Sequence, residues 1–457
     1  MYDLIVKNGN LVTADRVYPA DILVKDGKFA GFVEGSEKLE ASEIIDAKGK
    51  YIFPGIIDCH AHLNEPGYEY REDFATGSRA ASVGGTTTLI DMPLNNEPPL
   101  INSKVFDLKK SLIDRHTVVD YALWGGLIDN NLDELIPLYQ KGVVGFKAFT
   151  CPQTGSFPNV NMGHVKKAFE ILKPYGAFCG FHCEEYGMVL EMEREAKAKN
   201  HSGQEAIRDF LDAHCVLTEY SSVRNIIDQV RFSGAKAHIC HVSHPKVAQL
   251  VKEAQMEGLP ITAETCPHYL GFTEDLVFKL GAPAKCTPPL RTADAVEGLW
   301  SYVLDGTLSC VGSDHSPASD EEKDNTKHNI WTAWGGCNTI QFFLPIMWDM
   351  VVNKRKLSPT LITRVMDKNP AKVFGLYGEK GDFEIGFDAD IVILDPERPW
   401  KASAQTNLTK NKVTAFEGYE AKGCPERTMV RGRTVAENGT YKEDAFGYGH
   451  FVRPHNA

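Results

Sequence analysis

Several side chains of types that bind metal ions follow short apolar runs in this 457-residue sequence. His60-Ala61-His62 ends the run GIIDCHAHL, and residues i and i+2 of a strand point to the same face, about 6.6 Å apart. Two imidazole groups placed in this way can converge on one ion. Three further residues of ligand type also follow apolar runs: His182 in AFCGFHCEE, His241 in AHICHVS and Asp314 in LSCVGSDHSP. Nitrogen and oxygen donors without thiolate suit zinc, cobalt, manganese or nickel at a catalytic site.

Lys147 lies in the apolar run GVVGFKAF, where a charged ammonium group is costly to bury. A neutral lysine amine can take up carbon dioxide as a carbamate, which places a carboxylate on a long arm that can bridge two ions. Taken alone, a snorkelling or ion-paired lysine and hydrogen-bonded polar residues at strand ends are simpler interpretations. Taken together, the six residues predict a centre of two divalent metal ions bridged by N6-carboxylated Lys147, with zinc as the preferred metal.

Such a centre predicts a hydrolytic reaction. Two divalent ions roughly 3.5–4 Å apart hold a water molecule as hydroxide near neutral pH and polarise a carbonyl oxygen. Asp314 is the predicted catalytic residue, which takes the proton of this water and passes it to the leaving nitrogen while also binding metal. A small cyclic amide is the natural target, because its product keeps the carboxylate and the amine tethered.

The elements that position these residues can be counted along the chain. From Pro54 to about residue 375, eight apolar runs alternate with amphipathic stretches of helical length, which predicts an α/β fold with a closed (β/α)8 barrel. Strand patterns return beyond Gly386, so we expect residues 1–53 and 385–457 to form one small β-domain around a barrel of residues 54–384. Two polar loops, 150–163 and 315–329, are expected at the carboxyl-terminal rim of the barrel, either as lids or as plain connections.

Charge and composition narrow the class of partner. The net charge of −12 argues against nucleic acid and anionic membranes, which attract basic surfaces. No stretch approaches the roughly 20 apolar residues of a membrane helix, and the N-terminus lacks the features of a signal peptide. The 11 cysteines contain no CxxC pair and no disulfide framework, which predicts free thiols in a reducing compartment. We therefore expect a cytoplasmic enzyme with a small-molecule substrate.

Nearly the whole chain resembles the cyclic amidohydrolases of the amidohydrolase superfamily, and the allantoinases among them most closely. The resemblance rests on the segments FPGIIDCHAHLNEPG, GTTTLIDMPLNNEPP, GVVGFKAF, AETCPHYL, AKCTPPLR and GSDHSP. It implies a distorted TIM barrel flanked by a β-sandwich, a homotetramer, and hydrolysis of the cyclic ureide allantoin to allantoate in purine nitrogen catabolism.

The resemblance also implies a role for each site residue. His60, His62 and Asp314 would bind the more buried ion, His182 and His241 the more exposed one, and carboxylated Lys147 would bridge the two ions. Thr287 and Ser316 match positions that hold the substrate ring, and the segment WGGCN, which ends at Asn338, is expected to line the same pocket.

Other members of this group bear on the substrate. Dihydroorotases place an arginine after the HxHL segment to bind a carboxylate, and the neutral Asn64 at this position disfavours that reaction. Allantoinases usually carry an arginine after EPG and then Trp-Glu-Gly, where this chain has Tyr68 and Arg71-Glu72-Asp73. A hydantoinase or dihydropyrimidinase therefore stays open as an alternative. A non-catalytic scaffold of the same fold is disfavoured by the complete ligand set, and a single-metal deaminase is disfavoured by Lys147.

Overall fold

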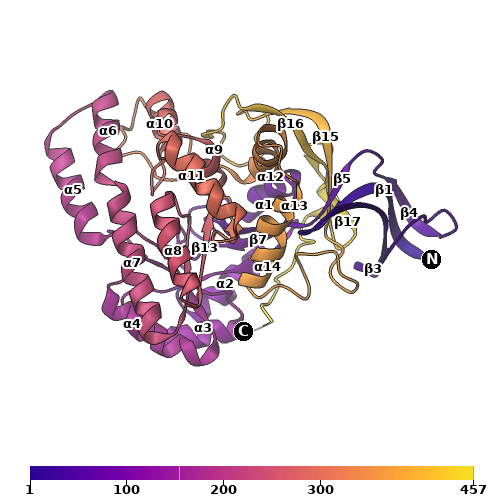
Figure 1. The fold of residues 1–457 in the computed structure, drawn as a ribbon, viewed down its shortest axis with the longest axis horizontal. Coiled ribbons are helices and arrows are strands. Elements are labelled where there is room, and N and C mark those ends of the chain that lie inside the picture. Colours follow the sequence, from indigo (N-terminus) through magenta and orange to yellow (C-terminus); the bar gives the residue numbers. More distant parts are fainter. Residues whose placement is uncertain (154, 456–457) are drawn as a thin grey trace.

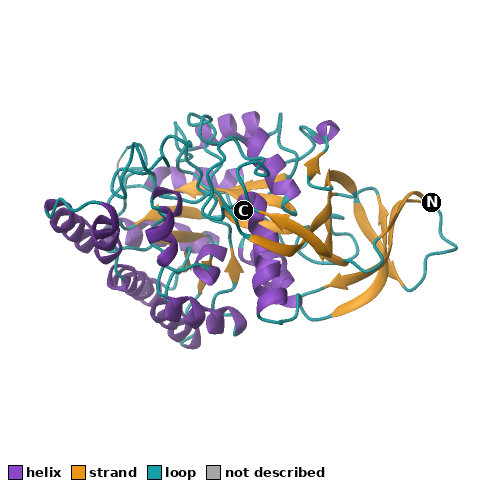
Figure 2. Cartoon of the chain, turned by 90° about the horizontal axis from the view of Figure 1, so that it is seen from above, coloured by secondary structure: helices purple, strands orange, loops and turns teal. Residues whose placement is uncertain are grey.

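The computed structural model describes residues 1–153 and 155–455. Thr154, in the predicted 150–163 loop, and residues 456–457, at the end of the predicted β-domain, lie outside the described residues. Helices surround a set of parallel strands in the larger part of the molecule, and strands from both chain ends form a sheet on the side where the N-terminus lies (Figures 1 and 2).

The predicted apolar runs all form parallel strands of one barrel, which confirms the predicted fold class. In chain order these strands are β6 (Ile56–Ala61), β7 (Thr86–Asp91), β8 (Asp120–Leu123) with β9 (Gly125–Gly126), β10 (Phe146–Phe149), β11 (Phe178–His182), β12 (Lys236–Ile239), β13 (Ile261–Thr265) and β14 (Cys310–Val311). β8 pairs with β7 and β9 pairs with β10, so the third run is one strand interrupted at Trp124. A parallel bridge between Ala61 and His315 joins the last strand to the first and closes the ring.

Helices follow the barrel strands and cover their outer side (Figure 1). They are α1 (Phe74–Val83), α2 (Ser103–Ile113), α3 (Leu135–Lys141), α4 (Met162–Leu172), α5 (Tyr186–Ala198), α6 (Gly203–Ala213), α7 (Val216–Ser233), α8 (Pro245–Met256), α9 (Pro267–Gly271), α10 (Asp275–Leu280), α11 (Ala293–Leu304), α12 (Phe343–Trp348), α13 (Thr360–Thr363) and α14 (Asn369–Val373). Side-chain caps start several of them, since Asp73 accepts from the Thr76 amide and Asn102 from the Val105 amide. Three helices, α5, α6 and α7, separate β11 from β12, so this connection is long enough to contribute residues to the rim of the barrel.

The two chain ends share one nine-stranded sheet. Its strands are β1 (Tyr2–Val12), β2 (Val17–Lys25), β3 (Lys28–Val33), β4 (Ala41–Asp46), β5 (Tyr51–Pro54), β15 (Ile391–Lys401), β16 (Glu420–Val430), β17 (Arg433–Glu437) and β18 (Thr440–Tyr441). β5 joins the two halves, because it pairs in parallel with β1 and antiparallel with β15. The β2–β3 turn places Asp26 and Gly27 at φ values of 51° and 74°, as an Asp-Gly hairpin turn requires.

The last residues of the chain leave this sheet. The Tyr121 amide donates to the His450 carbonyl oxygen (3.0 Å), and the Val452 amide donates to the Tyr121 carbonyl oxygen (2.7 Å). Residues 450–452 therefore lie along β8 of the barrel, although the pattern of strands places them with the β-domain. Backbone pairing with a barrel strand is a contact that side-chain patterns do not report.

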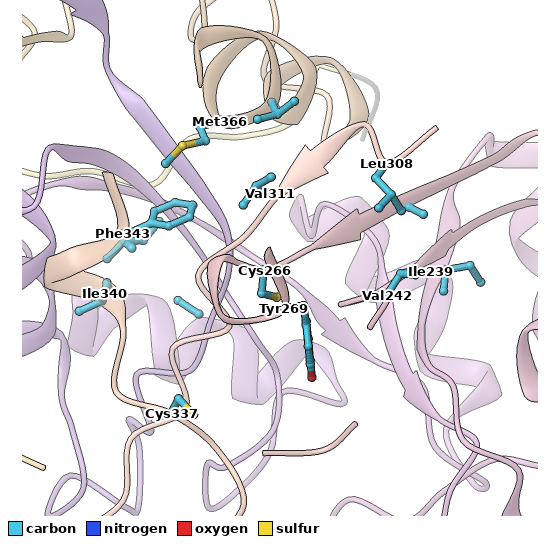
Figure 3. Packing of buried hydrophobic residues seen from close by; sticks show 14 of the residues in the cluster. Ile239, Val242, Cys266, Tyr269, Leu308, Val311, Cys337, Ile340, Phe343 and Met366 are labelled. Carbon is cyan, nitrogen blue, oxygen red and sulfur yellow. The ribbon is translucent and has the colours of Figure 1, made fainter. Parts of the chain in front are cut away.

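One hydrophobic cluster fills the space between the barrel strands and their helices and continues into the β-domain. Ile239 of β12, Val311 of β14 and Phe343 of α12 belong to it (Figure 3), as do Val392 and Val430 of the nine-stranded sheet. The barrel strands are thus held from outside by packed side chains, which leaves their carboxyl ends free to carry polar groups. Within the described residues, no helix combines the length and the apolar character needed to cross a membrane.

Candidate metal centre and substrate pocket

The first and last barrel strands bring His60, His62 and Asp314 together. The Asp314 Oδ1 atom lies 3.4 Å from His60 Nε2 and 3.6 Å from His62 Nε2. Asp314 has a φ of 45°, in the left-handed region that few residues other than glycine, asparagine and aspartate adopt. Such strain at a polar residue is typical of functional sites, where the surrounding structure holds the side chain in place. These three donors face one another as ligands of a single ion would.

The middle strands supply the other three predicted ligands. The His241 ring centre lies 5.3 Å from that of His60 and 4.6 Å from that of His182. Lys147 is fully buried, and within the described residues its Nζ atom has no hydrogen-bond partner. An unpartnered buried ammonium group costs several kcal/mol, on the order of the penalty for one buried charge, so this position fits a lysine whose charge is removed by carboxylation. The residues present therefore fit a centre of two metal ions.

Further side chains fix the orientation of the histidine rings. Glu264 of β13 accepts a hydrogen bond from His60 Nδ1, which leaves His60 Nε2 directed at Asp314. Glu184 Oε2 lies 2.8 Å from His182 Nε2, and Asn95 Nδ2 lies 3.4 Å from His62 Nδ1. Partners of this kind set the ring tautomer of metal-binding histidines. The sequence analysis missed Glu264, although its position as a charged residue inside the apolar run PITAETCPHY could have pointed to it.

Charge and burial set the protonation of this cluster. Burial raises the cost of ionising Asp314, but His60, His62 and His241 together outweigh it and hold the pKa of Asp314 well below its usual range. Burial lowers the pKa of His62 to about 4. Burial also opposes the charge of His60, but the Glu264 and Asp314 carboxylates together with a hydrogen bond to Cys240 outweigh it and raise the pKa of His60 to about 10. An ionised Asp314 and a neutral His62 are ready to bind metal, whereas His60 would release a proton on binding.

A cavity of about 280 Å³ opens above these residues and is lined by eight of the nine predicted site residues. Besides the six ligand-type residues these are Thr287 and Ser316, and Gln153, Lys285 and Trp334 add to the walls. Drug-sized ligands occupy pockets of roughly 300–1,000 Å³, so this cavity suits a small ring. Gln153 comes from the predicted 150–163 loop and Ser316 from the 315–329 loop, so both loops reach the cavity.

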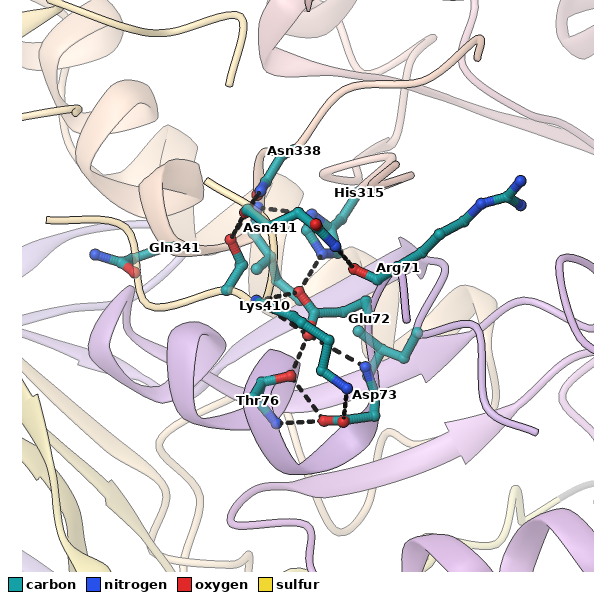
Figure 4. Close-up of polar contacts among 12 residues, drawn as sticks. Arg71, Glu72, Asp73, Thr76, His315, Asn338, Gln341, Lys410 and Asn411 are labelled. Atoms are coloured by element: carbon teal, nitrogen blue, oxygen red, sulfur yellow. Dashed lines mark hydrogen bonds and ion pairs between the residues drawn. The ribbon is translucent and has the colours of Figure 1, made fainter. Parts of the chain in front are cut away.

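Asn338 is the predicted site residue that does not line the cavity. Its side-chain amide donates to Thr409 Oγ1 (2.7 Å) and to the Asn411 carbonyl oxygen (2.8 Å). Asn411 in turn donates to the Arg71 carbonyl oxygen (2.6 Å), and the backbone amide of Lys410 donates to Glu72 (3.1 Å; Figure 4). Asn338 thus belongs to a polar network that ties the β15–β16 connection to the residues before α1.

The residues that depart from the allantoinase pattern hold rim loops together. The Arg71 guanidinium lies 3.7 Å from the Trp334 ring centre and 5.1 Å from the Tyr68 ring centre, and it donates to the Glu322 carboxylate. Asn64 is buried, with a φ of 54°. Tyr68 and Arg71 are absent from the cavity walls in the described structure, so these two departures change the loops that support the pocket more than the residues that line it. Asn64, at the position of the dihydroorotase arginine, is also absent from the walls.

One further wall comes from the α5–α6 segment and was missed by sequence reasoning. His214, which follows α6, lies between two carboxylates, with Nδ1 2.7 Å from Glu184 Oε1 and Nε2 3.0 Å from Glu193 Oε1. Burial opposes its charge, but Glu184 and then Glu193 outweigh it and raise the pKa of His214 to about 9. Burial lowers the pKa of Lys285, on the same wall, to about 7. Nothing in the spacing of these residues pointed to one wall, because His214 and Glu193 come from helices of the long β11–β12 connection and Lys285 comes from the β13–β14 connection.

Comparison with known proteins agrees with this geometry. The model of the Amidohydrolase family matches residues 51–435. An allantoinase of Escherichia coli K12 is 35% identical over 439 residues, which cover 95% of each chain. The solved structure of an L-hydantoinase (dihydropyrimidinase) from Arthrobacter aurescens matches with a TM-score of 0.95 and 34% identity over 99% of this chain and 100% of that one. A D-hydantoinase (dihydropyrimidinase) from Thermus sp. matches with a TM-score of 0.91 and 26% identity over 99% of both chains. The chain therefore belongs to the amidohydrolase family.

Proposed function

We propose that this enzyme, a hydrolase of cyclic amides, opens the ring of allantoin to give allantoate. One observation carries the proposal: six residues of ligand type from five barrel strands surround a single small cavity. The full-length similarity to an allantoinase supports allantoin as the ring that enters it.

The proposed centre uses the residues as follows. His60, His62 and Asp314 would hold one divalent ion, and His182 and His241 would hold the second. The Lys147 amine would add to carbon dioxide, forming a new N–C bond and releasing a proton, and the resulting carboxylate would bridge the ions. Zinc suits this donor set, with cobalt, manganese or nickel as alternatives.

When bound, such ions lower the pKa of a water molecule and polarise the ring carbonyl. The remaining steps belong to the protein. The Asp314 carboxylate takes the proton of the attacking water and delivers it to the ring nitrogen as the C–N bond breaks. The Thr287 and Ser316 hydroxyl groups line the cavity and would hold the ring against this carboxylate.

A hydantoinase or dihydropyrimidinase is the second candidate, and the TM-score of 0.95 to an L-hydantoinase favours it. A non-catalytic scaffold has less support, because the ligand set is complete. We also propose, from the family resemblance alone, a homotetramer in the cytoplasm that serves purine nitrogen catabolism.

The test is ring opening by protein purified after growth with zinc and bicarbonate. Allantoin, hydantoin, dihydrouracil and dihydroorotate would be compared at equal concentrations. We expect the highest kcat/KM on allantoin. Preference for hydantoin or dihydrouracil would replace the substrate while keeping the metal chemistry, and no activity on any ring with metal bound would favour the scaffold.

A further inference from the structure

One wall of the cavity carries a cation and an anion that are not paired with each other. Lys285 and Glu193 both line the cavity, but within the described residues no ion pair joins them. The Lys285 Nζ atom donates to the backbone carbonyl oxygens of Trp331 (3.3 Å) and Ala333 (2.7 Å). Glu193 lies on α5, whereas Lys285 follows α10, so the fold brings opposite charges to one wall without closing them into a salt bridge.

Two rings lie between these charges. Lys285 Nζ is 5.3 Å from the centre of the Phe210 ring, and the Phe210 and His214 ring centres are 4.8 Å apart. His214 Nε2 then lies 3.0 Å from Glu193 Oε1. All four side chains line the cavity. The wall is therefore a strip with an ammonium group at one end, a carboxylate at the other and the Phe210 and His214 rings between them.

Both ends of the strip keep unused hydrogen-bonding capacity. The protonated form of Lys285 has three donors, of which two are used, and a ligand carbonyl oxygen at the third would favour this form. A carboxylate offers about four acceptor positions, and Glu193 accepts from His214 and Lys197. Lys285 is 8% exposed, so its third donor is withdrawn from bulk water and a ligand acceptor would relieve the cost. The strip thus offers one donor and at least one acceptor to whatever fills the cavity.

We propose that this strip is the subsite for the exocyclic substituent of the substrate, and that it recognises a urea group. The urea carbonyl oxygen would accept a hydrogen bond from the Lys285 ammonium, and the urea N–H groups would donate to the Glu193 carboxylate. The flat urea would pack against the Phe210 ring. This inference rests on the proposed function, because allantoin is a hydantoin ring that carries a ureido group.

An apolar substituent suits the strip less well. It would cover the Lys285 donor and part of the Glu193 carboxylate without satisfying either, and unsatisfied buried polar groups oppose binding. The strip therefore predicts preference for allantoin over a hydantoin with an alkyl group of similar size. A purely structural role of Lys285, as an anchor for the backbone at Trp331 and Ala333, predicts no such preference.

The experiment compares kcat/KM of the metal-loaded enzyme on allantoin, on unsubstituted hydantoin and on 5-propylhydantoin. The variants are Lys285→Met and Glu193→Gln, with Lys279→Met and Glu191→Gln as controls at exposed positions on α10 and α5 that lie outside the cavity walls. We expect each strip variant to lose about 10- to 100-fold in kcat/KM on allantoin, the range for one hydrogen bond to a charged group, and less than about 3-fold on hydantoin. The controls should match the wild type on every ring.

The outcomes separate the two levels of inference. Equal losses on allantoin and hydantoin, with wild-type activity on allantoin intact, would overturn the strip as a urea subsite and leave the proposed function standing. A wild type that opens hydantoin but not allantoin would overturn both. If Lys285→Met does not fold, the test uses Glu193→Gln together with Lys285→Arg, which keeps a donor. In either case the wild type must prefer allantoin over 5-propylhydantoin.

Discussion

Replacing Glu264 with glutamine tests whether this buried carboxylate sets the geometry of the candidate metal centre. One carboxylate oxygen accepts from His60 Nδ1, and the other lies 3.3 Å from His238 Nε2 and 3.2 Å from the donor Cys59 Sγ. A glutamine amide has only one accepting oxygen, so one of these sets of donors loses its partner. Charge-assisted hydrogen bonds contribute about 1.5–3 kcal/mol and neutral ones about 0.5–1.5 kcal/mol, a difference near 1.5 kcal/mol. We therefore expect roughly 10-fold weaker zinc binding in Glu264→Gln.

The assay is zinc competition against a chelator of known affinity, together with kcat/KM at rising free zinc. Activity should fall at low zinc and recover in large part when zinc is raised, because the ligands themselves are unchanged. Glu219→Gln is the matched control, a buried carboxylate that accepts from Ser243 (2.9 Å) and Arg291 (3.2 Å) and touches none of the predicted ligands. It should lower the melting temperature but leave zinc affinity unchanged. Zinc affinity within about 2-fold of wild type in Glu264→Gln would refute the orienting role.

Three further changes have expected outcomes. Lys147→Ala should lose most bound metal and all measurable ring opening, short carboxylic acids should restore part of the activity, and full activity would contradict the bridged centre. Gly336→Ala should cost about 1–3 kcal/mol of unfolding free energy and lower kcat/KM, because φ is +140° and a Cβ would lie 2.5 Å from the Ser316 carbonyl oxygen. The control for stability is Gly335→Ala, whose Cβ would meet nothing closer than Thr287 Oγ1 at 3.8 Å and which should unfold in urea like the wild type. The raised pKa of His214 means that its charged form stabilises the fold below pH 6.5 and that this contribution, on the order of 3 kcal/mol, is lost as the pH rises to about 9. Between pH 6.5 and 9, the midpoint of urea unfolding should therefore fall less in His214→Gln than in the wild type. Equal falls in the two proteins would show that the charge of His214 does not stabilise the fold.

Most of the barrel could be predicted because each strand is a short apolar run bounded by polar residues, and a buried parallel strand requires that pattern. The break at Trp124 was not predicted, although the Gly125-Gly126 pair that follows it is poorly suited to the interior of a strand. The position of residues 450–452 along β8 was equally hidden, because it depends on backbone hydrogen bonds to Tyr121.

The predicted ligands converge because each lies near or just beyond the carboxyl end of a barrel strand, and these strand ends share one rim. Cavity residues that do not come from the ends of barrel strands were harder to predict. Glu193 and His214 reach the cavity from α5 and the end of α6, and the path of that connection is set by helix packing rather than by strand order. Asn338 shows the opposite error, since it is close to cavity residues in sequence but its side chain turns toward Asn411.

The bridge between Ala61 and His315 places the first and last barrel strands side by side, although about half of the chain separates them. The final barrel strand must therefore be synthesised before His60, His62 and Asp314 can come together, so the binding of an ion that we propose for these residues would be a late event in biogenesis. An ion bound by these three residues would hold the first and last barrel strands together. By mass action, an ion that binds only the folded state, at 100 times its dissociation constant, would raise the free energy of unfolding by about 2.7 kcal/mol.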